Sequence, residues 1–184
     1  MMQNIRYFDH AATTAIDNRV LNEMMPYLTF NYGNASSVYS IGKVAKEAIM
    51  IARMRVAASL NCKTHEIYFT SGGTESDNLA LKGIAMANSS YGNHIITTKI
   101  EHPAILNSCK ALENLGYKVT YLNVDKLGRI NLEELERSIT RKTILISIMF
   151  ANNEIGTIQP IKQIGNIARK YNVIFHTDAV QAVR

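Results

Sequence analysis

The apolar positions of this chain alternate between short runs rich in β-branched residues and longer stretches with helical spacing. The helical spacing predicts helices over residues 18–30, 42–60, 74–88, 131–138 and 161–170, with another helix after Pro103. The β-rich runs predict strands over residues 66–70, 94–98, 118–122, 143–149 and 173–177. Because strands and helices alternate, we predict an α/β fold with a mainly parallel sheet and helices on both faces. Ligands bind such sheets at the carboxyl ends of the strands.

Composition restricts the classes of protein that fit this pattern. Hydrophobic residues make up 47% and charged residues 19% of the 184 residues, which is typical of a globular domain. No apolar run is long enough for a membrane span and the N-terminus lacks an apolar signal core, so we expect a cytoplasmic protein without a membrane partner. A basic cluster on one predicted helix favours a solvated helix face over a nucleic-acid patch. The cluster comprises Lys43, Lys46, Arg53 and Arg55.

A glycine-rich turn follows the first predicted strand. It reads Thr-Ser-Gly-Gly-Thr-Glu-Ser-Asp-Asn over residues 70–78 and leads directly into a predicted helix. The free N–H groups and positive dipole end of such a helix suit a phosphate, and the hydroxyls of Ser71 and Thr74 can add donors. The alternative is an ordinary turn in which Thr74 caps the helix.

Polar side chains also follow the other strands of the predicted sheet. His102 can stack on a flat ring or move protons, or it is a surface-loop histidine. Asn152 and Asn153 can hold a carboxylate or a ring hydroxyl, or they form an Asn-rich turn. Asp178 suits a cationic partner such as a protonated pyridine nitrogen, with Gln181 beside it, or it caps the following helix. Phosphate, flat ring, ring oxygen and ring nitrogen together describe pyridoxal 5′-phosphate.

Six segments of the chain resemble the cysteine desulfurases of the NifS/IscS group. They are YFDHAATT (7–14), YGNASS (32–37), FTSGGTESDNLALKG (69–83), IITTKIEHPAIL (95–106), ANNEIGTIQPI (151–161) and FHTDAVQA (175–182). The resemblance implies a fold-type-I, class V aminotransferase-like enzyme. Residues 1–15 would be an N-terminal arm. Residues 16–184 would be the N-terminal part of an incomplete large domain of the aspartate aminotransferase-like fold, ending before the Schiff-base lysine and the small C-terminal domain.

The same resemblance implies a role for each candidate cofactor-binding residue. Gly73 and Thr74 would bind the phosphate of pyridoxal 5′-phosphate. His102 would stack on its ring and can act as an acid or base. Asp178 would pair with the ring nitrogen, and Gln181 would bond the ring oxygen. No metal is expected.

The implied reaction takes sulfur from L-cysteine, leaving L-alanine and an enzyme persulfide. Asn153 would contact the ring oxygen and the substrate carboxylate, and Asn34 would lie near that carboxylate. The Schiff-base lysine and nucleophilic cysteine are expected beyond Arg184, because Cys62 and Cys109 match neither role.

The resemblance also implies partners and leaves alternatives. A sulfur-acceptor protein of iron–sulfur assembly or tRNA thiolation would receive the sulfur, and the full-length protein would be a homodimer. One alternative is a selenocysteine lyase or another class V enzyme. Another is a truncated fragment without activity, or a dimerising or binding module without catalysis.

Overall fold

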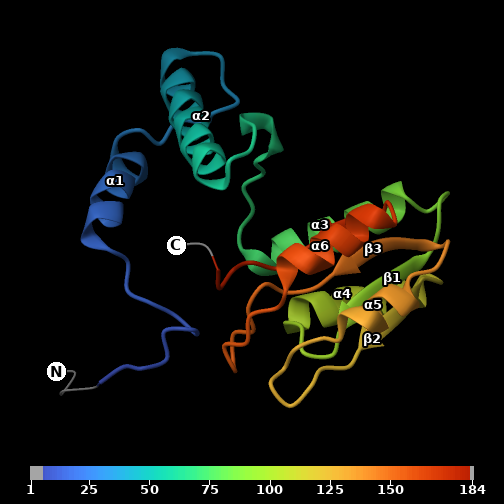
Figure 1. Cartoon of the computed structure of the whole chain (residues 1–184). Helices are drawn as coiled ribbons and strands as arrows, with labels where there is room; N and C mark the ends of the chain where they lie inside the picture. Colours follow the sequence, from blue (N-terminus) through green and yellow to red (C-terminus); the bar gives the residue numbers. More distant parts are fainter. Residues whose placement is uncertain (1–5, 183–184) are drawn as a thin grey trace. The chain divides into compact units, whose positions relative to one another are not determined.

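The computed structural model describes residues 6–182 (Figure 1). The chain divides into two compact units, Met1–Phe69 and Thr70–Arg184. None of the helices in the described part is both long enough and apolar enough to cross a membrane.

The first unit is helical. It contains α1 (Asn18–Thr29), α2 (Ser40–Leu60) and the short 3-10 helix η1 (Thr64–Glu66). The carboxylate of Asp17 caps α1 by accepting the Arg19 N–H at 2.8 Å. Helix α2 ends at Asn61, whose left-handed backbone (φ 52°) stops the helix as a C-terminal cap does.

The predicted strand at residues 66–70 is wrong. Glu66 belongs to η1, and its carboxylate accepts the Lys63 N–H at 2.6 Å. Ile67 does adopt an extended backbone, as its β-branched side chain favours. Its carbonyl, however, accepts a hydrogen bond from Arg53 Nε at 3.2 Å, and the described residues provide no strand beside it. The β-branched composition therefore favours an extended backbone here, but the segment does not pair with another strand among the described residues.

The second unit contains a four-stranded sheet that confirms the predicted α/β fold. The strands are β1 (His94–Thr98), β2 (Lys118–Leu122), β3 (Thr143–Ser147) and β4 (Ile174–His176). Their order is β2-β1-β3-β4, and every neighbouring pair is parallel. The carboxyl ends of all four strands therefore lie at one edge of the sheet.

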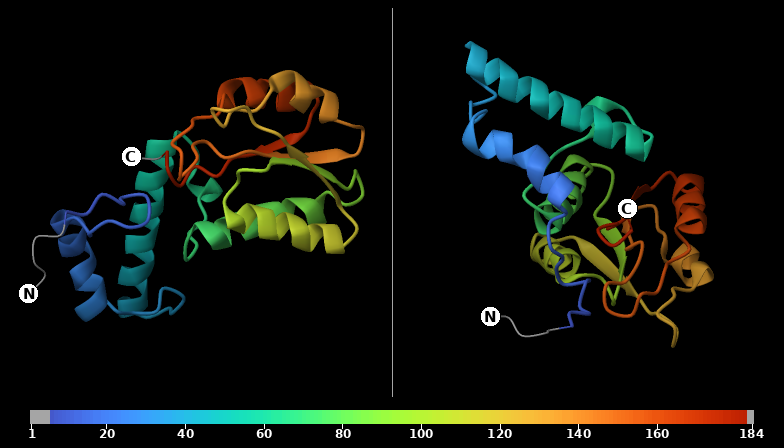
Figure 2. Two further views of the ribbon diagram at one scale, coloured as in Figure 1. Left: turned by 90° about the horizontal axis from the view of Figure 1, so that it is seen from below. Right: turned by 90° about the vertical axis from the view of Figure 1, so that its left-hand side faces the viewer.

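Helices cover both faces of this sheet (Figure 2). They are α3 (Gly73–Ala87), α4 (Pro103–Asn114), α5 (Leu132–Ser138) and α6 (Ile161–Lys170). On one face, α3 and α4 bury Leu81 and Leu112 against Ile95. On the other, α5 and α6 contribute Leu135 and Ile164 to a separate core. The sheet is thus packed between two apolar cores, one on each face. The polar loops that follow the strands lie at the edge where the strands end.

Candidate active site

His102 lies just after β1, where it caps helix α4. Its Nδ1 accepts the Ala104 N–H at 3.1 Å, and Pro103 occupies the first position of the helix. The ring is half-buried. Because Nδ1 is an acceptor here, the neutral ring carries its proton on Nε2. The histidine is therefore held in one orientation with Nε2 left for another contact.

The glycine turn at residues 70–73 leads into α3 as predicted, but Thr74 is not its cap. Helix α3 begins at Gly73, so Thr74 is its second residue. The loop is closed by Glu75, whose Oε2 accepts both the N–H and the hydroxyl of Ser71 at 2.6 Å. The first N–H groups of the helix have no partner within it, which leaves them for an anion. A Cβ on Gly73 would lie 3.0 Å from Val180 Cγ2, so this turn lies against the segment after β4.

The two asparagines after β3 have different surroundings. Asn152 is buried, and its amide donates to the Ile100 carbonyl at 2.9 Å. Its side-chain oxygen accepts the N–H groups of Glu154 and Ile155 at 2.9 and 3.0 Å. Asn153 is partly exposed, and within residues 6–182 its amide makes no hydrogen bond. Asn152 therefore builds the turn, while the amide of Asn153 is available to a ligand.

Asp178 follows β4 and stands at the start of a turn. Its Oδ1 accepts the Val180 N–H at 3.0 Å, and its carbonyl accepts the Phe150 N–H at 2.8 Å. Residues 180–182 form a turn that also contains Gln181. The carboxylate thus caps that turn through one oxygen, and the two predicted roles of Asp178, cap and ligand, are compatible.

Two further carboxyl groups are buried near Asp178. Asp77 on α3 and Glu101 before α4 are each only 4% exposed. Burial, and then the charge of Asp178, raise the pKa of Asp77 to about 6. Burial also raises the pKa of Glu101 to about 7, although hydrogen bonds from Thr98 and Met149 oppose the shift. Three acidic side chains therefore lie near one another at this edge of the sheet, and burial favours the neutral form of two of them.

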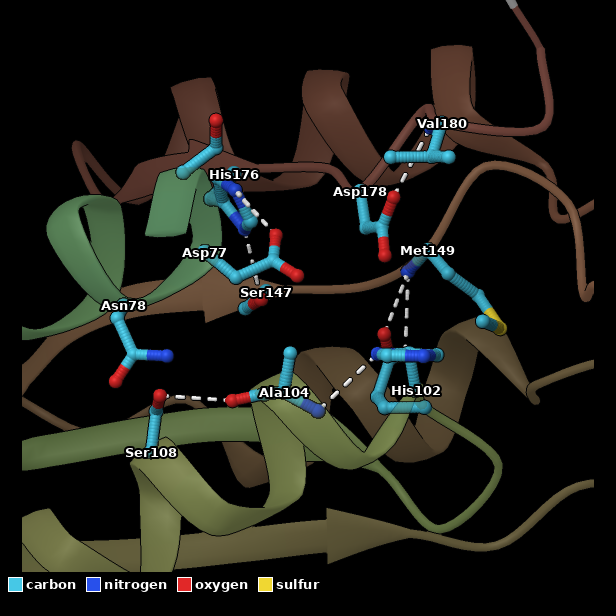
Figure 3. Close-up of polar contacts among 12 residues, drawn as sticks. Asp77, Asn78, His102, Ala104, Ser108, Ser147, Met149, His176, Asp178 and Val180 are labelled. Atoms are coloured by element: carbon cyan, nitrogen blue, oxygen red, sulfur yellow. Dashed lines mark hydrogen bonds and ion pairs between the residues drawn. The ribbon is translucent and has the colours of Figure 1, made fainter. Parts of the chain in front are cut away.

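His176 lies beside this acidic group on β4 (Figure 3). Its Nδ1 is 2.9 Å from Ser147 Oγ on β3, and its Nε2 is 3.8 Å from Asp77 Oδ1. Burial lowers the pKa of His176, while the charge of Asp178 opposes that shift. A neutral His176 does not compensate the carboxyl groups, so its contact with Asp77 is polar rather than a full ion pair.

This arrangement fits a ligand that carries both an anionic and a cationic group. Among residues 6–182, no lysine or arginine forms an ion pair with Asp77, Glu101 or Asp178. Buried carboxyl groups without such a partner favour a bound cation. The start of α3 offers N–H donors to an anion. A phosphate joined to a protonated pyridine ring matches this donor set.

Sequence reasoning missed Asp77, Glu101 and His176, although Asp77 and His176 each left a signal. Asp77 lies four residues before Leu81 and eight before Ala85, which are both buried, so it occupies the apolar stripe of α3. His176 precedes Asp178 by two residues and therefore lies on the same side of the strand. Glu101 directly precedes His102, and only its burial distinguishes it from a surface acid.

Three further residues from the sequence analysis are Asn34, Cys109 and Cys62. Asn34 belongs to the first unit, where its Oδ1 accepts the Ser36 N–H at 2.9 Å. Its place near a substrate stays a prediction. Cys109 is buried in the core, which raises the pKa of its thiol to about 12 and makes it a poor nucleophile. Cys62 is half-buried in the first unit.

Comparisons with known proteins identify the family of this chain. Residues 6–184 match the family model described as aminotransferase class-V. The chain is 58% identical to the cysteine desulfurase IscS of Methanosarcina thermophila over 96% of its own length and 44% of the relative's. It is 56% identical to the IscS of Clostridium botulinum, covering 96% of this chain and 45% of that protein.

Solved structures show the same relationship. A NifS-like protein superposes with a TM-score of 0.93 at 45% identity, covering 96% of this chain and 49% of the other. SspA in complex with cysteine also superposes with a TM-score of 0.93, at 42% identity over 97% and 51% of the two chains. The chain spans about half the length of the relatives it matches. The matched family model, the sequence identity and the shared fold together show that this chain belongs to the class-V aminotransferase family.

Proposed function

We propose that this chain is the cofactor-holding part of a pyridoxal-phosphate-dependent cysteine desulfurase. The observation that carries the proposal is the pair of buried carboxyl groups, Asp77 and Glu101, beside Asp178 and the first turns of α3. Within residues 6–182, no lysine or arginine forms an ion pair with these three acids. Relatives named cysteine desulfurase, at 56–58% identity, support it. The SspA structure supports L-cysteine as the substrate, because that protein was solved with cysteine.

Each residue would hold one part of the cofactor. The first turn of α3, at Gly73 and Thr74, would bind the phosphate through backbone N–H groups. Asp178 would face the ring nitrogen and keep it protonated. His102 would lie against the ring, and Asn153 and Gln181 would bond its oxygen. When bound, the cofactor supplies an electron sink that weakens bonds in the substrate amino acid.

The protein residues prepare the site before the ligand arrives. The bond from Ala104 to His102 Nδ1 leaves Nε2 as the proton-bearing atom, so this ring can donate a hydrogen bond without a change of tautomer. Asp178 keeps one oxygen on the Val180 N–H, which leaves the other for a cation. Asn153, together with Asn34, would orient the substrate carboxylate.

The wider assignment belongs to the longer protein. There we propose a homodimer in the cytoplasm that passes sulfur from L-cysteine to an acceptor protein of iron–sulfur assembly or tRNA thiolation. Neither Cys109, with its raised pKa, nor Cys62 is assigned as the sulfur carrier. A protein that contains this segment together with the Schiff-base lysine and the nucleophilic cysteine should release L-alanine from L-cysteine.

Cofactor binding tests the proposal on this chain. The purified protein is titrated with pyridoxal 5′-phosphate and its affinity is measured by absorbance. We expect Asp178→Asn to weaken binding about tenfold or more, because a hydrogen bond to a charged group contributes roughly 1.5–3 kcal/mol. Asp125→Asn is the matched control, since Asp125 also accepts the N–H of the residue two positions on, Leu127, at 2.8 Å but lies in an exposed loop. Equal affinity in the two variants would refute the assignment of Asp178.

A further inference from the structure

Glu101 joins two loops that carry separate parts of the candidate site. Its Oε1 accepts the Thr98 hydroxyl at 2.7 Å. Both of its carboxyl oxygens lie 3.1 Å from the Met149 N–H, 48 residues further along the chain. The loop after β1 is therefore tied to the loop after β3 by a side chain that is only 4% exposed.

A second tie runs parallel to the first. The amide of Asn152 donates to the Ile100 carbonyl at 2.9 Å, so the loop after β3 is also bonded to the residue before Glu101. The Phe150 N–H, in turn, donates to the Asp178 carbonyl at 2.8 Å. We call the bonds made by Glu101 and Asn152 the loop clasp. Together with the Phe150 bond, the loop clasp links the ends of β1, β3 and β4.

The loop clasp lies directly beside the residues assigned to the cofactor. His102 follows Glu101 in the sequence, and Asn153 follows Asn152. Figure 3 shows His102, Met149 and Asp178 on three different segments that meet at this edge of the sheet. Displacing either loop would therefore move one ring contact relative to another.

A buried carboxyl group is an unfavourable side chain for a contact that only holds two loops together. Titratable groups of α3, α4 and the segment after β4 interact with Glu101, namely Asp77, Cys109 and Asp178. The two acids among them disfavour a charged Glu101, and so does its burial. A neutral amide could still accept the Thr98 hydroxyl and the Met149 N–H through its one oxygen without this penalty. The acid becomes favourable when a cation occupies the site, because it then adds attraction to that of Asp178.

We propose that Glu101 is a positioning residue for the cofactor: it holds His102 and Asn153 in register and adds a second negative charge near the protonated ring. The proposal rests on the proposed cofactor site. In this proposal Asn152 has a structural role, and Asn153 contacts the ligand. The proposal also predicts that the hydrogen bonds of Glu101 and the charge of Glu101 have separate effects on the site, which different substitutions can distinguish.

Two substitutions separate these contributions. Glu101→Ala removes the Glu101 bonds of the loop clasp together with the charge. Glu101→Gln removes the charge and one acceptor oxygen but keeps the other oxygen for the Thr98 hydroxyl and the Met149 N–H. Glu113→Gln is the matched control, because Glu113 is exposed on α4 and its carboxylate accepts the Tyr121 hydroxyl at 3.1 Å. All three changes are made in the full chain.

The first measurement needs no cofactor. In NMR spectra of the labelled protein, Glu101→Ala should speed hydrogen exchange at the Met149 amide and shift the His102 ring and Asn153 side-chain signals. Glu101→Gln and Glu113→Gln should leave these signals near their original positions. If Glu101→Ala leaves them unchanged, or Glu101→Gln shifts them as much as Glu101→Ala does, the positioning role is overturned.

The second measurement is the affinity for pyridoxal 5′-phosphate between pH 6 and pH 8. Relative to the original chain, Glu101→Gln should bind equally at pH 6 and about tenfold more weakly at pH 8, where Glu101 is charged. Glu101→Ala should bind about tenfold or more weakly at both pH values. A constant ratio between the original chain and Glu101→Gln overturns the charge role. If the original chain binds no cofactor although its NMR signals respond as expected, the proposed function fails and this proposal is overturned with it, leaving the clasp as architecture alone.

Discussion

The raised pKa of Glu101 predicts a specific dependence of stability on pH in the cofactor-free protein. The usual pKa of this side chain is 4.5, and in the fold it is about 7. A group whose folded pKa is raised contributes stability that is fully present below its unfolded pKa and is lost as the pH rises through the folded pKa. Stability from Glu101 is therefore present below about pH 4.5 and is lost by about pH 8.

The size of this effect follows from the shift. The difference between 7 and 4.5 is 2.5 pKa units. At about 1.4 kcal/mol per unit, the unfavourable contribution of charged Glu101 reaches about 3 kcal/mol above pH 7. Asp77 adds an effect of the same sign, because its pKa is also raised. Glu101→Gln should therefore change stability by less than about 1 kcal/mol at pH 5 and increase it by up to about 3 kcal/mol at pH 8.

Urea unfolding followed by far-ultraviolet circular dichroism measures this difference at pH 5, 6, 7 and 8. Glu113→Gln controls for a change of net charge on an exposed helix face. The reasoning is refuted if Glu101→Gln lowers stability at pH 8, or if its stability differs from that of the original chain by the same amount at every pH. A more stable variant with weaker cofactor binding would show that this site exchanges stability for ligand affinity.

Three other predictions concern two glycines and a buried histidine. Gly83→Ala on α3 should raise the unfolding free energy by about 1 kcal/mol, because a Cβ there meets no atom within 4 Å. Gly92→Ala should lower it by about 2 kcal/mol or more in the same urea titration, because its Cβ would overlap the Lys142 carbonyl. His94 is buried between the hydroxyls of Thr143 and Thr120, at 2.7 and 2.9 Å, and burial lowers its pKa. Its contribution is present above about pH 6.5 and is lost as the pH falls through the lowered pKa, so His94→Gln should flatten the stability profile between pH 5 and pH 6.5.

Much of the fold could be predicted from local patterns. The strands at His94–Thr98 and Lys118–Leu122 and the helix at Ile161–Lys170 have the predicted bounds. These elements combine strong periodicity with clear turn residues on either side, so local preference and burial agree. The segment at residues 66–70 has the same β-rich composition, but a strand also requires a neighbour to accept its hydrogen bonds.

The candidate site was partly predictable for a related reason. In a parallel sheet every strand ends at the same edge, so His102, Asn153 and Asp178 were identified from strand positions and from the family resemblance. The different roles of Asn152 and Asn153 could not be predicted. It depends on whether an amide reaches the Ile100 carbonyl, a contact between residues far apart in the sequence.

The sequence by itself determined the order of the elements, the sheet class and the polar residues that follow each strand. Only the tertiary structure decided which acids lie near one another, and that two of them, Asp77 and Glu101, are buried. Asp77, Glu101 and Asp178 come from three segments, and the pKa values of Asp77 and Glu101 are raised because packing removes water and places like charges near each other. Desolvation and proximity depend on all the surrounding segments at once, so no local pattern encodes them.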